Sequence, residues 1–528
     1  MTIGWWSLLV AALFYARFGY SFGVGDHDEM IPQLLRMLDP SLFPADWYLQ
    51  GEAGRVTVRT PFLLALRLFA APFGVEGGVF AAWLVVLLGV TVGVWQLAWR
   101  LTENRAATAL ATLGAMVGTP LWALGGNGLV ASLIVPEPMA WALALPAVGL
   151  FMGGRRWLAG ALLGVAGLFQ LLVGTLTVGA LGLVWLWEIA ADEERRSRWL
   201  SELGRAVGFG LVYLLVASPV FVPTALAQTA GSPAPDDGLS LFYVIAQLRQ
   251  PHHYLFLHFG ERAIAQVGLL VLLGVASFWW LKRRDLLKHE RFVGRLLVVI
   301  AALCGVALVG TEGLQILFVA KLQFYKLTVL ATVLLVTMIA AAAVALVPSG
   351  WQERADRALA SPWGWAIASL AVAAVTILGL GGWKNGPAQH RASDLYAVEA
   401  WVRQHTEPDA LFLIPPSETT FRTWARRSVA INWKPTPFRD DAMRERLARL
   451  RTVAPSAELP ALGIRWKETL DAAYHQNTRA TWQHLAAEWG ADYALVEVDR
   501  LETPPDAEPA FQSGGWAVYP LAPSGDRP

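Results

Sequence analysis

Residues 25–50, GDHDEMIPQLLRMLDPSLFPADWYLQ, form a polar and acidic stretch between segments that are apolar enough for a membrane. Asp26, Asp28 and Glu29 lie within four residues of one another, directly after the first apolar segment. The apolar residues at 31, 34, 35 and 38 follow at helical spacing, which predicts a short amphipathic helix. We therefore expect carboxylates at a membrane surface, where one of them can act as a general base on an incoming hydroxyl.

The same acidic residues also suit a structural role. Acidic side chains at a helix start accept hydrogen bonds from free backbone N–H groups and suit the helix dipole. Pro32 fits the first turn of such a helix. The stretch alone leaves catalysis and helix capping as open alternatives.

The composition of the whole chain indicates its class. Of 528 residues, 55% are hydrophobic, only 16% are charged, and 25 are tryptophan. Charged residues are missing from long windows and gather in short loops and in the last quarter of the chain. This pattern is typical of a polytopic membrane protein, and it does not favour nucleic acid as a partner. The one cysteine, Cys304, excludes an intrachain disulfide.

Apolar windows of about 20 residues, long enough to cross a bilayer as a helix, recur through residues 1–384. Segment 60–73 is short and carries Arg67, so we expect an interfacial helix at the end of an external loop that covers residues 23–75. Window 157–187 needs two short helices with a break near 170–175. The prediction is an all-α membrane domain of about eleven transmembrane helices, at 3–20, 77–99, 106–124, 130–152, 157–187 (two), 206–226, 264–281, 296–310, 327–347 and 363–380.

Lys and Arg are distributed unevenly between the short loops. Loops 100–105, 153–156, 192–205, 282–295 and 348–357 hold about 16 of them, against about 4 in the opposite set without the acidic loop. Because basic loops remain on the cytoplasmic side, we expect the N-terminus in the cytoplasm. We interpret the N-terminal apolar segment as a first span that is retained and not as a cleaved signal peptide. The acidic loop, loop 228–262 and the C-terminal region are then external.

Residues 385–528 are predicted to form a small external α/β domain, because charges and prolines return there. Ser393 can cap a helix, and helical patterns recur at 440–451 and 479–489. Segments 410–414, 429–433 and 491–499 have the composition of strands. We find no phosphate loop, nucleophile elbow or zinc spacing, so this domain is expected to recognise an acceptor or to cover a cavity.

A histidine-containing segment, RQPHHYLFLHFGER at 249–262, is a second polar group on the expected external face. Arg249, His252 and His253 could hydrogen bond to a phosphate or sugar, or pack at the interface. A divalent metal is the weaker alternative, because adjacent histidines point in different directions and no carboxylate lies at ligand spacing.

Further cations lie on the same expected face. Lys321, Tyr325 and Lys326 precede a predicted span, where cations suit the phosphate of a lipid carrier or extend to the interface. In the soluble domain a solvated surface is the preferred interpretation, and a phosphate site the alternative, for Arg422, Arg426, Arg427 and Lys434.

Several strings carry a resemblance: LDPSLFPADWY (38–48), QPHHYLF (250–256), LQFYK (322–326) and PPSETTFRTWARRSVAINWK (415–434). They resemble an uncharacterised bacterial family of membrane proteins that are similar to the GT-C glycosyltransferases. That superfamily draws sugar from polyprenyl-phosphate carriers, and it combines an acidic first external loop with a C-terminal soluble domain. Asp26 or Asp28 would match its acidic position, although His27 between them departs from the common paired-acid pattern.

The resemblance implies transfer of a sugar from a polyprenyl-phosphate donor to a glycan, lipid or protein acceptor outside a bacterial inner membrane. Asp28 is the preferred base, Asp26 the alternative, and Glu29 would orient the acceptor. No cofactor is implied. The residues expected to hold the departing phosphate are Lys321, Lys326 and Arg249. The alternatives are a non-catalytic protein that binds lipid carriers or assists assembly and, third, a transporter.

Overall fold

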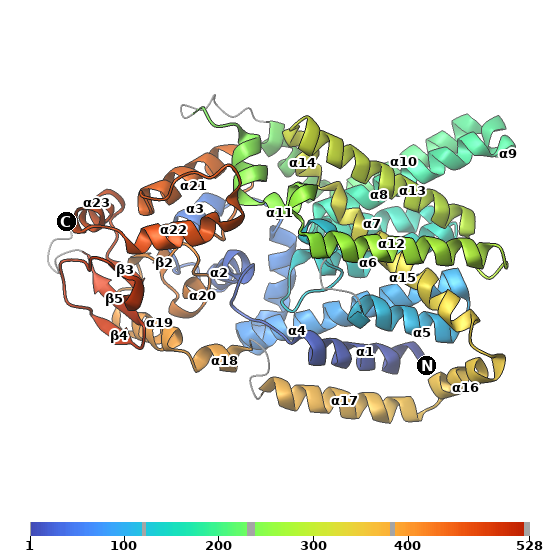
Figure 1. The fold of residues 1–528 in the computed structure, drawn as a ribbon, viewed down its shortest axis with the longest axis horizontal. Helices are drawn as coiled ribbons and strands as arrows, with labels where there is room; N and C mark the ends of the chain where they lie inside the picture. The colour runs from blue at the N-terminus through green and yellow to red at the C-terminus, as the bar shows by residue number, and fades with distance from the viewer. Residues whose placement is uncertain (1, 119–122, 230–237, 381–385, 522–528) are drawn as a thin grey trace.

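The computed structural model of the chain describes residues 2–118, 123–229, 238–380 and 386–521. It is mostly helical, and a smaller part at the C-terminal end carries a sheet (Figure 1). Among the described residues, six helical segments are long and apolar enough to cross a membrane, as expected of a multi-pass membrane protein: Thr60–Thr102, Leu171–Ala191, Trp199–Gln228, Glu261–Lys282, Glu290–Gly313 and Leu317–Ala345. The first four are formed by α4 (Thr60–Thr102), α8 (Leu171–Ala191), α10 (Trp199–Thr229) and α12 (Glu261–Lys282). The fifth joins α13 (Glu290–Leu308) to the π-helical turn η5 (Val309–Gly313), and the sixth joins α14 (Leu317–Leu322) and η6 (Phe324–Lys326) to α15 (Leu327–Ala345).

The remaining predicted windows are also helical, in shorter segments. They contain α1 (Thr2–Phe18), α5 (Arg105–Leu113), α6 (Pro136–Met152), α7 (Arg156–Phe169) and α17 (Trp363–Leu380). Residues 119–122 of the predicted window 106–124 lie outside the described residues.

Two predicted interruptions occur where the sequence placed them. Within α4, Gly74 has a φ of 69°, which separates segment 60–73 from the helix that follows. Gln170 has an extended backbone, with a φ of −140°, and divides window 157–187 into α7 and α8. Glycines of α7 then bring α10 close, because a Cβ at Gly160 would lie 2.9 Å from the Phe209 carbonyl oxygen.

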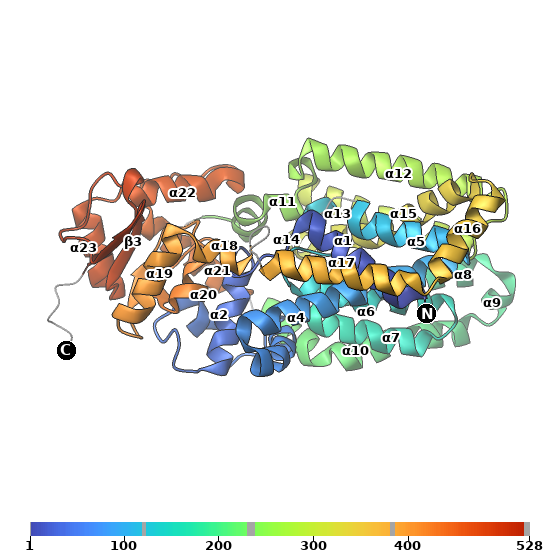
Figure 2. The same ribbon diagram turned by 90° about the horizontal axis from the view of Figure 1, so that it is seen from below.

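The two ends of the helical body differ. The N-terminus, α9 (Glu193–Ser197) and α16 (Ser349–Ala360) lie at one end, and α2 (His27–Leu38), α3 (Trp47–Glu52) and the C-terminal part lie at the other (Figures 1 and 2). Two of the basic loops meet, since the Lys288 N–H donates to the Leu101 carbonyl oxygen at 2.9 Å. The acidic loop and the C-terminal part therefore share one end of the molecule.

The C-terminal part is an α/β unit with a five-stranded sheet of order β2-β1-β3-β5-β4. β1 (Leu411–Leu413) pairs in parallel with β2 (Ser428–Val429) and β3 (Tyr493–Glu497), and β5 (Trp516–Pro520) is antiparallel to β3 and β4 (Phe511–Ser513). The helices are α18 (Pro387–Arg391), α19 (Asp394–His405), α20 (Phe421–Ala425), α21 (Asp440–Val453), α22 (Trp466–His475) and α23 (Arg479–Trp489). Ser393 caps α19 as predicted, accepting from the Tyr396 N–H at 3.2 Å. The predicted boundary between residues 384 and 385 lies outside the described residues.

The segment 242–255 belongs to the same hydrophobic core as the C-terminal sheet. It contains a π-helical turn, η3 (Tyr243–Arg249), and α11 (Pro251–Tyr254). Leu248 and Tyr254 pack in one cluster with Leu411 and Trp466, and the Tyr243 hydroxyl donates to the Pro460 carbonyl oxygen at 2.5 Å. Arg249, His252 and His253 are thereby carried to the junction between the helical body and the C-terminal part.

Candidate functional site

His27 fixes the start of the acidic loop. Its Nδ1 accepts from the Gly23 N–H at 3.0 Å, so Nε2 carries the proton and donates to the Ile134 carbonyl oxygen at 3.1 Å. Burial lowers the pKa of His27 to about 4. The imidazole is therefore neutral near pH 7, and it ties the first turn of α2 to the segment before α6.

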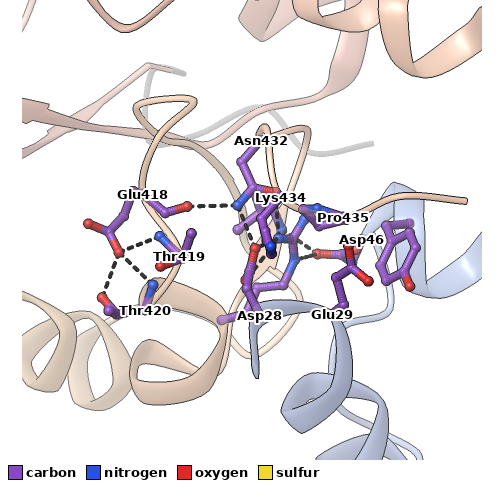
Figure 3. Close-up of polar contacts among 12 residues, drawn as sticks. Asp28, Glu29, Asp46, Glu418, Thr419, Thr420, Asn432, Lys434 and Pro435 are labelled. Carbon is purple, nitrogen blue, oxygen red and sulfur yellow. Dashed lines mark hydrogen bonds and ion pairs between the residues drawn. The ribbon is translucent and has the colours of Figure 1, made fainter. Parts of the chain in front are cut away.

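Asp28 and Asp46 join the acidic loop to the C-terminal part through one arginine, Arg422 (Figure 3). Nη1 of Arg422 lies 3.2 Å from each carboxylate oxygen of Asp28, and its Nε donates to Asp46 at 2.6 Å. Asn432 donates to Asp28 at 2.7 Å, and Asp46 also caps α3 through the Leu49 N–H at 3.1 Å. All four side chains are buried, so this network (Asp28, Asp46, Arg422 and Asn432) is a buried lock between two distant parts of the chain.

The surroundings of Asp28 act on its pKa in opposite directions. Burial raises the pKa of Asp28 to about 6, although Arg422 and Asn432 favour the charged form and lower it. Asp28 is only 1% exposed, and both of its oxygens have partners in the buried lock. A substrate hydroxyl has no direct access to this carboxylate.

Glu29 forms a second buried ion pair, with Arg59. Arg59 also donates to the Tyr48 hydroxyl at 2.8 Å. Burial works against the charge of Arg59, but Glu29 and Tyr48 raise its pKa above the usual value. Glu29 is therefore engaged inside the loop, where it holds α2 against the start of α4.

Asp26 has different surroundings, because its side chain is 49% exposed. It forms an ion pair with Lys434, which comes from the extended segment after β2 and is 28% exposed. Desolvation alone would raise the pKa of Asp26, but Lys434, assisted by His253 and His27, lowers it. Although Asp26 stands at the helix start, its side chain accepts no capping hydrogen bond from α2 within the described residues.

The histidine segment lies beside this ion pair. Arg249 donates to the Lys434 carbonyl oxygen at 2.7 Å, and His253 contacts the Gly125 carbonyl oxygen at 2.6 Å. Burial, followed by Arg249 and Lys434, lowers the pKa of His252 to about 4. Burial and then His252 lower the pKa of His253 to about 3.

The metal alternative gains no support from this segment. Among the described residues, no group of three or more His, Cys, Asp or Glu side chains could hold a metal ion. Because their pKa values are lowered, His252 and His253 are neutral near pH 7 and offer hydrogen-bonding rings beside the ion pair of Asp26 and Lys434.

Lys321 and Lys326, predicted to hold one phosphate, face different partners. Lys321 donates to Asp440 of α21 at 2.7 Å. Lys326 donates to Glu137 at 2.7 Å and to Asn127 at 2.8 Å, near the start of α6. Within the described residues the buried Tyr325 hydroxyl has no hydrogen-bond partner. The two lysines therefore have separate carboxylate partners, Asp440 and Glu137.

Sequence reasoning missed several members of the buried pairs, and one interpretation was wrong. Arg422 and Arg427 were expected on a solvated surface, but they are 1% and 6% exposed. Arg427 donates to the Thr406 carbonyl oxygen at 2.8 Å, at the end of α19. Asp46, Arg59 and Asn432 were not predicted as site residues. Only the position of Asp46 before a short helix gave a local signal.

Comparison with known proteins gives one family match. The profile of a family described as a domain of unknown function (DUF6798) matches residues 393–453. No curated protein matches the chain. The matched segment begins at the cap of α19, ends with α21, and contains the three side chains that contact the acids of the first loop, Arg422, Asn432 and Lys434.

Proposed function

We propose that the chain is a membrane glycosyltransferase of the GT-C type, which transfers a sugar from a polyprenyl-phosphate donor to an acceptor hydroxyl. The observation that carries the proposal is the half-exposed carboxylate of Asp26, beside Lys434, at the end of an apolar helical body. Arg249, His252 and His253 supply further groups for a phosphate or sugar at this place.

We assign the role of general base to Asp26 rather than Asp28, because Asp26 is accessible and Asp28 has both oxygens engaged. In the step that we propose, the acceptor oxygen forms a bond to the anomeric carbon of the sugar. The bond from that carbon to the phosphate oxygen breaks, and polyprenyl phosphate leaves with the electron pair. The acceptor proton passes to Asp26. Lys434 stabilises the charge that develops on the leaving phosphate, and the charge of the buried Arg249, behind the Lys434 carbonyl oxygen, adds to this effect.

We also propose about eleven spans, a cytoplasmic N-terminus and an external C-terminal domain, in a bacterial inner membrane. The gathering of the basic loops at the end opposite the C-terminal part supports this orientation. A reporter that is active only outside the cytoplasm should be active after Pro528 and inactive after Arg198. Reversed activities would contradict the orientation.

A non-catalytic protein that binds lipid carriers or assists assembly is the second candidate. It is favoured by a specific observation, because Asp28, Glu29 and Asp46 all serve in buried ion pairs that hold the acidic loop in place. Such a protein would keep the buried lock and would not need the carboxylate of Asp26.

The test is transfer from a radiolabelled polyprenyl-phosphate sugar to acceptors in membranes of a deletion strain. Asp26→Asn keeps the shape of the side chain but cannot take a proton, and loss of a general base costs about 10²- to 10⁴-fold in rate. Asp28→Asn should retain transfer within about tenfold, because we assign it no proton transfer. Asp499→Asn, at an exposed position of the C-terminal domain, is the matched control. Transfer that survives Asp26→Asn unchanged would contradict the assignment of the base.

A further inference from the structure

Four consecutive carbonyl oxygens after β2 accept hydrogen bonds from buried arginines. We call residues 433–436 the strap. Arg446 donates to the carbonyl oxygens of Trp433 and Pro435, the latter at 2.8 Å, and Arg249 donates to that of Lys434 at 2.7 Å. Arg59 lies 3.5 Å from the carbonyl oxygen of Thr436. The three arginines come from α21, η3 and the segment before α4, so three parts of the chain fix one short segment.

Burying these guanidinium groups is costly, and the strap is what offsets part of the cost. Arg249, Arg446 and Arg59 are 5%, 3% and 8% exposed. Burial lowers the pKa of Arg249 and of Arg446, because it disfavours their charged forms. Charged groups remain buried only where hydrogen bonds compensate them, and here backbone carbonyls do so. Pro435 further restricts the strap and the residue before it, Lys434.

The rigid strap leaves the side chain of Lys434 as its movable charged group. The ion pair of Lys434 with Asp26 is partly exposed on both sides, and such pairs contribute little to stability. Lys434 can therefore leave Asp26 at small cost while its backbone stays in place. Among the described residues, Arg249 and Arg446 have carbonyl, hydroxyl and ring partners but no paired carboxylate, so two guanidinium groups without an ion-pair partner lie against the strap.

We propose that the strap is the anion-recognition element of the site, and that Lys434 exchanges Asp26 for the phosphate of the bound lipid donor. This inference rests on the proposed function, and it gives the donor a second role. Donor binding removes the cation that lowers the pKa of Asp26, while His27, His253, Arg59 and Arg249 remain around the carboxylate. Asp26 then becomes a stronger base only when a donor is present.

The test is binding to the full-length protein in nanodiscs of neutral lipid, with farnesyl phosphate, farnesol and inorganic phosphate as probes. We expect farnesyl phosphate to bind more tightly than farnesol or inorganic phosphate. Lys434→Gln should weaken binding of farnesyl phosphate about tenfold, because it removes a charge-assisted hydrogen bond. Lys434→Arg should retain binding within a few-fold. Lys467→Gln, at another lysine of the C-terminal domain, is the matched control and should bind like wild type.

The sign of a second substitution separates exchange from a fixed ion pair. Asp26→Asn frees Lys434, so it should tighten binding of farnesyl phosphate several-fold, the opposite of Lys434→Gln. Weaker binding by Asp26→Asn, unchanged binding by Lys434→Gln, or equal binding of farnesyl phosphate and farnesol would overturn the proposal. Equal affinity for inorganic phosphate would overturn the assignment to a lipid-linked phosphate.

Failure of this inference can be told from failure of the proposed function. If the binding pattern is as expected and no sugar transfer is detected, the proposed role of the strap in anion recognition is supported, and the proposed glycosyltransferase activity is not. If transfer occurs and Lys434→Gln leaves KM for the donor unchanged, the proposed glycosyltransferase activity is supported, and the proposed role of the strap is not.

Discussion

Asp26 and Asp28 are neighbours in the sequence but have opposite surroundings in the structure. Asp28 is 1% exposed and belongs to the buried lock, whereas the Asp26 side chain is 49% exposed and forms an ion pair with Lys434. Their partners, Arg422 and Lys434, both come from the C-terminal part, so the two acids do not differ in the part of the chain that they contact. The difference lies in solvent access, which separates an acid that holds the fold from an acid that solvent can reach.

The largest effect is expected from breaking the buried lock at its centre. Arg422→Met would leave Asp28 and Asp46 buried without their cation, and loss of one partner of a buried ion pair costs about 3–5 kcal/mol. Thermal unfolding in detergent should show this loss, together with separation of the acidic loop from the C-terminal domain in hydrogen exchange. Arg451→Met, at an exposed position of α21, is the matched control. Equal unfolding temperatures for the two variants would contradict the structural role of Arg422.

A smaller loss is expected at the neutral member of the lock. Asn432 is fully buried, donates to Asp28 and to the Glu418 carbonyl oxygen at 2.7 Å each, and accepts from Arg422 (Figure 3). Asn432→Ala leaves these groups unsatisfied and should cost about 1–3 kcal/mol. Chemical unfolding measures the difference, and Gln512→Ala on the exposed face of β4 should unfold like wild type. A loss of unfolding free energy no larger than that of Gln512→Ala would show that Asn432 does not stabilise the buried lock.

The contributions of Asp28 and Asp26 to stability should change with pH in opposite directions. The folded pKa of Asp28 is about 6, above its unfolded value of about 3.9. Between these values the folded state binds the extra proton, so the contribution of Asp28 to stability rises as the pH falls, by about 1 kcal/mol per pH unit. The folded pKa of Asp26 is lowered, so its contribution is present above the unfolded pKa and is lost as the pH falls through the folded pKa.

The measurement is the free energy of unfolding of wild type, Asp28→Asn and Asp26→Asn between pH 7.5 and 3.5. Relative to Asp28→Asn, wild type should gain stability as the pH falls from 6 to 4. Relative to Asp26→Asn, it should lose stability at the acid end. Two differences of the same sign would show that burial does not separate the two carboxylates.

The smallest effect is expected at the exposed pair. Near pH 7, Asp26→Asn should change the free energy of unfolding by less than about 0.5 kcal/mol, because partly exposed ion pairs are screened by solvent. Lys434→Gln should behave alike, since Arg249 and Arg446 donate to the carbonyl oxygens of Lys434 and Trp433 and hold the backbone of the strap in place. A loss as large as that of Asn432→Ala would make the pair structural.

The helices could be predicted because apolar length is a local property of the chain. The break at Gln170, the separation at Gly74 and the cap at Ser393 were predicted for the same reason. The β4–β5 hairpin was missed, although Gly514 and Gly515 between its two strands are a turn signal. The predicted strand at 429–433 is shorter in the structure, because only Ser428 and Val429 pair with β1.

The site was harder to predict, because its contacts join distant residues. Arg422 and Asp46 are 376 positions apart, and no local pattern relates them. Spacing placed Asp26, Asp28 and Glu29 together, but it could not show that two of them are buried in ion pairs. Lys434, the partner of Asp26, was one of four cations that were expected on a solvated surface. That prediction was wrong for Arg422 and Arg427, which are buried.

Chemical labelling measures the solvent access of each carboxylate, and it requires no knowledge of the reaction. The full-length protein in nanodiscs is treated with a water-soluble carbodiimide and glycine ethyl ester, and modified residues are quantified by peptide mass spectrometry. We expect that Asp26 is modified while Asp28, Glu29 and Asp46 are protected, and that Lys434→Gln speeds the modification of Asp26. Modification of Asp28 as fast as that of Asp26 would contradict the division between a buried lock and an accessible acid.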